Sequence, residues 1–170
     1  MSKPRLYFET SALSRLIDDK AAHTVGRERH AAQGLLGLLR QGRVDGFSSD
    51  WALEELRRLP SAVRKTLLAA VRPWLKVLPI GPDDVARAEL LAAGNFSRDD
   101  ALHVALAERI RAQVLLTADA RMVMAARCAR IVTVDVANLF EWLQEFSHDE
   151  DRQEDREEDR QQDREGDSEE

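Results

Sequence analysis

The sequence has little cysteine and no long apolar run. Its single cysteine, Cys128, cannot form an intrachain disulfide, which indicates a reducing compartment. No apolar run approaches the roughly 20 residues that a helix needs to cross a bilayer. The basic start is interrupted by Glu9 too early for a signal peptide. We therefore expect a soluble, cytoplasmic protein that makes no membrane contact, with Cys128 buried near the last strand.

Several common catalytic signatures are also missing. The four histidines and one cysteine do not have the spacing of a zinc site. The chain contains no GxSxG, P-loop or GxGxxG motif. His103 lies within an amphipathic segment, so we expect a packed helix residue rather than a catalytic base. The acidic side chains remain as the candidates for chemistry.

Charge is distributed unevenly along the chain. Residues 147–170 contain 13 acidic and 4 basic side chains, a net charge of −9. The other 18 acidic and 21 basic side chains give residues 1–146 a net charge of +3, which permits a polyanionic partner. The acidic segment has no apolar residue after position 148, so we expect a disordered tail. Its charge could also compete with a polyanionic partner for the body of the protein.

Short apolar segments alternate with amphipathic ones. Strands are expected at 6–8, 44–49, 74–80, 113–117 and 131–134, and helices at 10–17, 23–40, 50–59, 61–71, 83–93, 97–110, 119–127 and 137–146. Such alternation is typical of parallel βαβ units. It predicts one α/β domain over residues 1–146, a three-layer α/β/α sandwich with a central, mostly parallel sheet.

Glu9 stands at the end of the first predicted strand, between the apolar run Leu6-Tyr7-Phe8 and the hydroxyl residues Thr10 and Ser11. Open α/β sheets place their sites at the carboxyl ends of strands. We expect Thr10 or Ser11 to cap the next helix, which leaves Glu9 without a capping duty. A half-buried acid at this position requires a positive partner.

Three further acids fall at the same predicted edge of the sheet. Glu55 is in the helix after the second strand, Asp100 opens the helix before the third central strand, and Asp119 follows that strand. Each has a structural interpretation that stays open. Asp100 could complete a capping box with Ser97, Asp119 could be an N-cap, and Glu55 could be solvated.

Four converging carboxylates would repel each other unless cations occupy the site. All-oxygen ligands favour a hard cation, Mg²⁺ or Mn²⁺. Such an ion can activate water and neutralise a phosphate without a nucleophilic side chain. The four acids therefore predict a site for a hard cation at this edge of the sheet.

Four segments in order resemble the PIN-domain nucleases, and most closely the single-domain VapC-type toxins: LYFETS, SSDWALEEL, DDALHVALA and LLTADARM. The resemblance covers roughly residues 5 to 143. By this pattern Glu9, Glu55, Asp100 and Asp119 match the family's catalytic acids. Ser11 and Thr117 match hydroxyl positions beside the site. The family's first acid is usually Asp, whereas this chain has the longer Glu9.

The resemblance implies an endoribonuclease that uses Mg²⁺ or Mn²⁺ to hydrolyse RNA phosphodiester bonds, with Glu9, Asp100 and Asp119 as metal ligands. It also implies the toxin of a toxin–antitoxin pair, which forms a homodimer and is blocked by a cognate antitoxin. One alternative is a PIN-like module that binds RNA or protein without catalysis. A phosphatase-like α/β hydrolase is disfavoured because no Asp-x-Asp pair follows the first strand.

Overall fold

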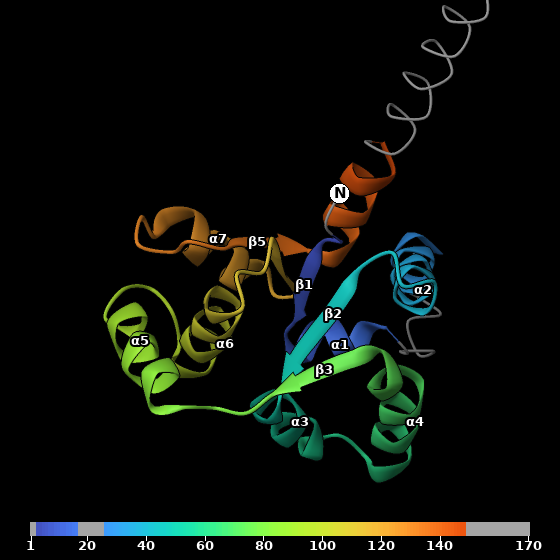
Figure 1. The fold of residues 1–170 in the computed structure, drawn as a ribbon, viewed down its shortest axis with the longest axis horizontal. Coiled ribbons are helices and arrows are strands. Elements are labelled where there is room, and N and C mark those ends of the chain that lie inside the picture. Colours follow the sequence, from blue (N-terminus) through green and yellow to red (C-terminus); the bar gives the residue numbers. More distant parts are fainter. Residues whose placement is uncertain (1–2, 17–25, 149–170) are drawn as a thin grey trace, which may run out of the picture.

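The computed structural model describes residues 3–16 and 26–148, and its centre is a five-stranded sheet (Figure 1). The strands are β1 (Arg5–Phe8), β2 (Asp45–Ser49), β3 (Leu75–Leu78), β4 (Val114–Thr117) and β5 (Asp135–Asn138). Their order is β3-β2-β1-β4-β5, and every neighbouring pair is parallel. The α/β sandwich expected from the sequence is confirmed.

The helices follow the strands in the alternation read from the sequence. They are α1 (Thr10–Arg15), α2 (Gly26–Arg40), α3 (Asp50–Glu55), α4 (Ser61–Val71), α5 (Pro82–Ala92), α6 (Arg98–Arg109) and α7 (Ala120–Cys128), with 3₁₀ turns η2 (Leu56–Arg58) and η3 (Arg72–Trp74). A final helix covers residues 139–148 of the described chain.

The sheet separates two apolar cores. Leu6 and Phe8 of β1 point into a core shared with α1, α2 and the final helix, whereas Tyr7 points into a second core with α5, α6 and α7. All three side chains are fully buried. The alternation follows from the period of two in a strand, and Figure 1 shows the two helical layers on either side of the sheet. β1 therefore lies at the centre of the molecule.

Two glycines are required by the backbone around β2. Gly42 has φ +65°, and the N–H of the next residue, Arg43, donates to the carbonyl of Leu38, which ends α2 in a Schellman turn. A Cβ on Gly46 would lie 2.8 Å from a methyl carbon of Leu75. Gly42 is therefore a left-handed cap at the end of α2.

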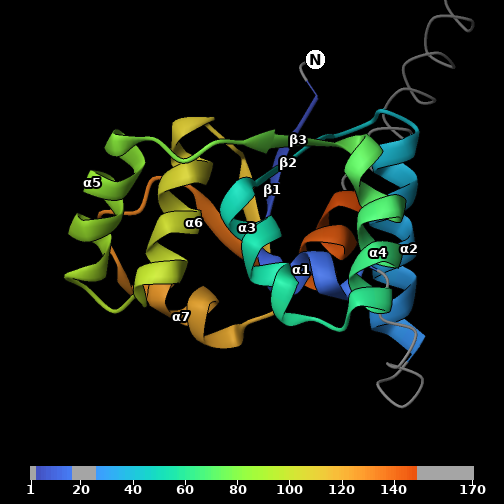
Figure 2. The same cartoon turned by 90° about the horizontal axis from the view of Figure 1, so that it is seen from below.

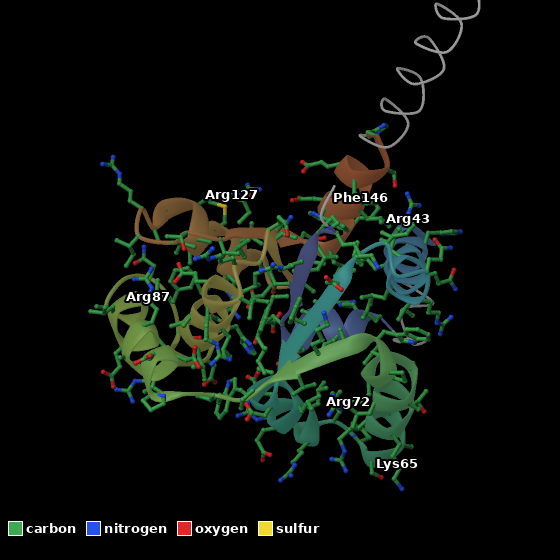
Figure 3. All side chains as sticks on the ribbon, viewed as in Figure 1. Arg43, Lys65, Arg72, Arg87, Arg127 and Phe146 are labelled. Carbon is green, nitrogen blue, oxygen red and sulfur yellow. The ribbon has the colours of Figure 1, made fainter. Side chains whose placement is uncertain are left out.

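The last strand was predicted in the wrong place. Residues 131–134 do not join the sheet, and β5 instead begins at Asp135. Two backbone groups of that segment form hydrogen bonds with side chains rather than with a neighbouring strand. Arg87 donates to the carbonyl of Ile131, and Glu108 accepts the N–H of Thr133. Arg87, labelled on α5 in Figure 3, also pairs with Glu108 and so joins α5 to α6.

Three other expectations concern Cys128, the membrane and the tail. Cys128 is exposed at the end of α7, so its predicted burial was wrong. Among the residues that the structure describes, no helix has the length and apolar character needed to cross a membrane. The predicted disordered tail lies outside the described residues from position 149 onward.

Candidate active site

The strand order brings the four predicted acids to one edge of the sheet. Glu9 follows the central strand β1, and Asp119 comes two residues after the neighbouring strand β4. Glu55 ends α3, which follows β2, and Asp100 lies in the first turn of α6. In the view from below, α3 lies between α6 and α1 beneath this edge (Figure 2). Side-chain contacts between these helices confirm that arrangement.

Glu9 is held by hydroxyl and amide donors. Its Oε2 accepts bonds from Ser11 Oγ at 2.5 Å and from Thr117 Oγ1 at 2.8 Å, and its Oε1 accepts the Ser11 N–H at 2.8 Å. The last bond makes Glu9 the N-cap of α1. The expectation that Thr10 or Ser11 caps this helix was wrong, because the longer Glu9 side chain folds back onto the first turn.

The two hydroxyl residues also connect strands β1 and β4. Ser11 Oγ accepts the N–H of Ala118 at 2.8 Å, and Thr117 Oγ1 accepts the N–H of Asp119 at 3.0 Å. Glu9 is 8% exposed, so its carboxylate is nearly removed from solvent. Charge-assisted bonds from these donors compensate for that burial.

Of the two capping interpretations, the structure confirms that of Asp119: it is the N-cap of α7, and its Oδ1 accepts the N–H of Arg121 at 2.8 Å. At the start of α6 the cap is Ser97, whose Oγ accepts the backbone N–H of Asp100 at 3.1 Å. Burial nevertheless raises the pKa of Asp100; the hydrogen bond with Ser97 lowers it, and the charges of Glu9 and Asp119 raise it further. Asp100 therefore lies within the electrostatic field of two other acids.

The pKa of Glu55 is shifted in the opposite direction to that of Asp100. Its Oε2 accepts bonds from Thr10 Oγ1 at 2.5 Å and from His103 Nε2 at 2.8 Å. Burial raises the pKa of Glu55, but the bonds from His103 and Thr10 outweigh it and hold the pKa below its ordinary value. The neighbouring Glu54 faces solvent and pairs with Arg57. Of these two adjacent acids, Glu55 is therefore the one that faces the interior.

Sequence reasoning treated His103 only as a packed helix residue. It is packed, at 2% exposure, but both ring nitrogens have polar partners: Glu55 on one side and the Tyr7 hydroxyl, 3.0 Å from Nδ1, on the other. The sequence feature that could have indicated a role for His103 at the site was its spacing of three residues from Asp100. Residues three apart on a helix share a face, so His103 had to face the same side as that acid.

The residues suit a hydrated hard cation better than an all-protein cage. Within residues 3–16 and 26–148, no three His, Cys, Asp or Glu side chains are close enough to form a ready-made metal site. The donors are nevertheless carboxylate oxygens, and the repulsion that Asp100 feels from Glu9 and Asp119 is what a cation would relieve. Mg²⁺ commonly keeps several waters and uses only one or two carboxylates.

Comparison with known families identifies the fold. The PIN domain family model matches residues 6–127, more than half of the chain. The protein belongs to the PIN-domain family. The match includes all four acids and the sheet edge on which they meet. No curated protein sequence matches the chain.

Solved structures show the same PIN fold in proteins of low sequence identity. VapBC2 from Rickettsia felis, bound to a DNA fragment from its promoter, is 12% identical, with a TM-score of 0.54 over 79% of this chain and 98% of that one. Mycobacterium tuberculosis VapC20, a sarcin–ricin loop cleaving toxin, is 20% identical, with a TM-score of 0.52 over 71% and 94%. At these identities the likeness concerns the fold.

Proposed function

We propose that this PIN domain is a divalent-metal-dependent endoribonuclease that hydrolyses RNA phosphodiester bonds. The observation that carries the proposal is the environment of Asp100, a partly buried acid whose pKa is raised by burial and by the charges of Glu9 and Asp119. Such a cluster is costly unless a cation binds it. PIN nucleases generally use divalent metal ions, and this acid set suits Mg²⁺ or Mn²⁺.

The proposed roles follow from the positions of the side chains. Glu9, Asp100 and Asp119 would hold the cation, which when bound supplies Lewis acidity at the phosphate and lowers the pKa of water. Ser11 and Thr117 keep the Glu9 carboxylate in place. Glu55, whose depressed pKa keeps it ionised at neutral pH, would accept a hydrogen bond from the attacking water.

We further propose that the protein is the toxin of a toxin–antitoxin pair and acts as a homodimer. Two structures with the same fold support the toxin assignment by analogy, since one is described as VapBC2 and the other as a sarcin–ricin loop cleaving toxin. An antitoxin would then be the cognate protein partner and RNA the substrate. Co-expression with the product of an adjacent gene, followed by size-exclusion chromatography, tests the pairing.

The nuclease proposal is tested by RNA cleavage in Mn²⁺, in Mg²⁺ and in EDTA. We expect cleavage to need the metal and Asp100→Asn to lower kcat/KM on the order of 100-fold or more, since a lost metal ligand removes transition-state stabilisation. Asp99→Asn, one residue earlier in the same helical turn, is the matched control and should keep most of the activity. Cleavage that persists in EDTA and in Asp100→Asn would reject the metal mechanism.

A non-catalytic PIN-like module that binds RNA or protein is the second candidate. It is favoured by the state of Glu9, whose two oxygens already accept three hydrogen bonds from Ser11 and Thr117. An acid engaged in this way has less capacity to bind a cation. RNA binding in a gel-shift assay, together with no cleavage in any divalent metal, would favour this candidate.

A further inference from the structure

The proposed reaction leaves His103 without a role, although the residue is buried and both of its ring nitrogens have polar partners. The imidazole is buried between Glu55 and Tyr7, with Nε2 2.8 Å from Glu55 Oε2 and Nδ1 3.0 Å from the Tyr7 hydroxyl. Because each ring nitrogen has a partner from a different element, the ring cannot turn without losing one of them. The orientation of His103 is therefore fixed by the fold.

The far end of this chain of contacts is anchored in the sheet. The Tyr7 hydroxyl donates to Ser49 Oγ at 2.9 Å, and Ser49 Oγ also accepts the N–H of Ala52 as the cap of α3. Burial raises the pKa of the Tyr7 phenol, so it stays protonated. The chain thus runs from the central strand, through the buried imidazole, to the last residue of α3.

The ionised state of the Glu55 carboxylate determines whether Nε2 of His103, the nitrogen that contacts it, carries a proton. An ionised carboxylate can only accept hydrogen bonds, and the pKa of Glu55 lies below its ordinary value. Nε2 of His103 must therefore carry a proton and donate it to this contact. The remaining role of Nδ1 depends on how the Tyr7 and Ser49 hydroxyls are oriented.

Both donors bind the same oxygen of Glu55. Thr10 Oγ1 and His103 Nε2 contact Oε2, while Oε1 bonds to no other group in the described part of the chain. The Glu55 side chain is 14% exposed, so a path to solvent remains. One oxygen is anchored and the other is left to accept a bond from outside the protein.

We propose that His103 is a positioning residue that, together with Thr10, anchors Oε2 of Glu55 and leaves Oε1 to accept a hydrogen bond from the attacking water. The role rests on the proposed ribonuclease function. Asp100 and His103 lie one turn apart on α6, so a single rigid helix sets both the acid on the cation side and the residue that orients Glu55. This coupling gives the site geometric precision.

A spectroscopic measurement on the metal-free full-length protein tests the contact itself. Imidazole ¹⁵N–¹H spectra should show His103 protonated at Nε2, with a proton protected from exchange. Glu55→Gln should move that signal upfield, because the acceptor loses its charge. An unprotonated Nε2, or a signal that Glu55→Gln leaves in place, would overturn the proposal whether or not the protein cleaves RNA.

Kinetics with three substitutions then separate positioning from packing. His103→Gln can place an amide donor near the position of Nε2, whereas the shorter His103→Asn can serve only the side of Tyr7. We expect His103→Ala and His103→Asn to lower kcat about 10–100-fold with little change in KM, as is usual for residues that orient a ligand. His103→Gln should recover most of that loss.

A control for the effect of replacing any histidine by glutamine is His30→Gln. His30 is exposed, and this substitution should leave kcat unchanged. Equal losses in folded His103→Gln and His103→Asn would overturn the positioning role, as would wild-type kcat in His103→Ala. If the wild-type protein cleaves no RNA in Mn²⁺, the proposed function fails, and the ¹⁵N spectra still decide whether His103 orients Glu55.

Discussion

Asp100 and Glu55 are carboxylates at the same edge of one sheet, yet their surroundings are opposite. Asp100 lies in the field of Glu9 and Asp119, and its pKa is raised by burial and by those charges. Glu55 receives bonds from His103 and Thr10, and its pKa is lowered despite burial. The partners of Glu55 outweigh its burial, whereas the hydrogen bond with Ser97 and the charge of His103 do not offset the burial of Asp100 and the charges of Glu9 and Asp119. The difference separates the proposed cation side of the site from the side that orients water.

Neutralising each acid in turn should change stability in opposite directions. Glu55→Gln loses two charge-assisted bonds and should lower the free energy of unfolding by about 1–2 kcal/mol. Asp100→Asn relieves repulsion and should raise it by about 0.5–2 kcal/mol, as substitutions in strained active sites often do. Urea denaturation in EDTA measures both. A change of the same sign in the two variants would remove the electrostatic distinction.

The pH dependence of stability sharpens the same distinction. The pKa of Glu55 is lowered from 4.5, so its stabilisation is complete above that value and is lost as pH falls through the folded-state pKa. The pKa of Asp100 is raised from 3.8, so its cost is absent below that value and complete above the folded-state pKa. The cost of Glu55→Gln and the gain from Asp100→Asn should therefore both shrink toward acid pH. Denaturation curves at several acidic pH values provide the check, and effects independent of pH would contradict the assigned causes.

Shortening Glu9 should have a smaller effect. Glu9→Asp keeps a good N-cap for α1 but withdraws the carboxylate from Thr117. We expect the free energy of unfolding to fall by about 0.5–1.5 kcal/mol, the usual net value of a hydrogen bond. The control is a double-mutant cycle with Thr117→Val, which also loses the acceptor of the Asp119 N–H; the loss in the double variant should be smaller than the sum of the two single losses. Fully additive losses would show that Glu9 and Thr117 do not interact.

The smallest effect is expected beside Glu55. Glu54 is half exposed and pairs with the exposed Arg57 at 3.0 Å, a kind of contact that is commonly worth less than about 1 kcal/mol. Glu54→Gln should therefore change thermal stability far less than Glu55→Gln, although the two residues are adjacent. Comparable losses would mean that burial of the carboxylate does not distinguish them.

The sequence predicted the elements better than their contacts. Short apolar segments between amphipathic ones were enough to predict the parallel sheet and the edge where the acids meet. The strand predicted at 131–134 was wrong because apolar character alone does not reveal that Arg87 and Glu108 form hydrogen bonds with the backbone of this segment. The strand instead began at Asp135, whose residue type gives little strand signal.

At the site, residue type indicated the acids but not their partners. Glu9 caps α1 by accepting the N–H of Ser11, although Glu is not among the residue types usually preferred at an N-cap. The contact of His103 with Glu55 joins residues 48 positions apart, and no local pattern contains it. Contacts of this kind depend on how α3 and α6 pack, so they become visible only in three dimensions.

A Mn²⁺ titration followed by electron paramagnetic resonance tests most directly whether the cation side and the Glu55 side are distinct. In the wild-type protein we predict saturable Mn²⁺ binding. Asp100→Asn should weaken it about 10–100-fold, as expected when the coordination of a metal is disturbed, whereas Glu55→Gln should weaken it much less. Equal losses in the two variants, or a wild-type protein that binds no Mn²⁺, would contradict the account.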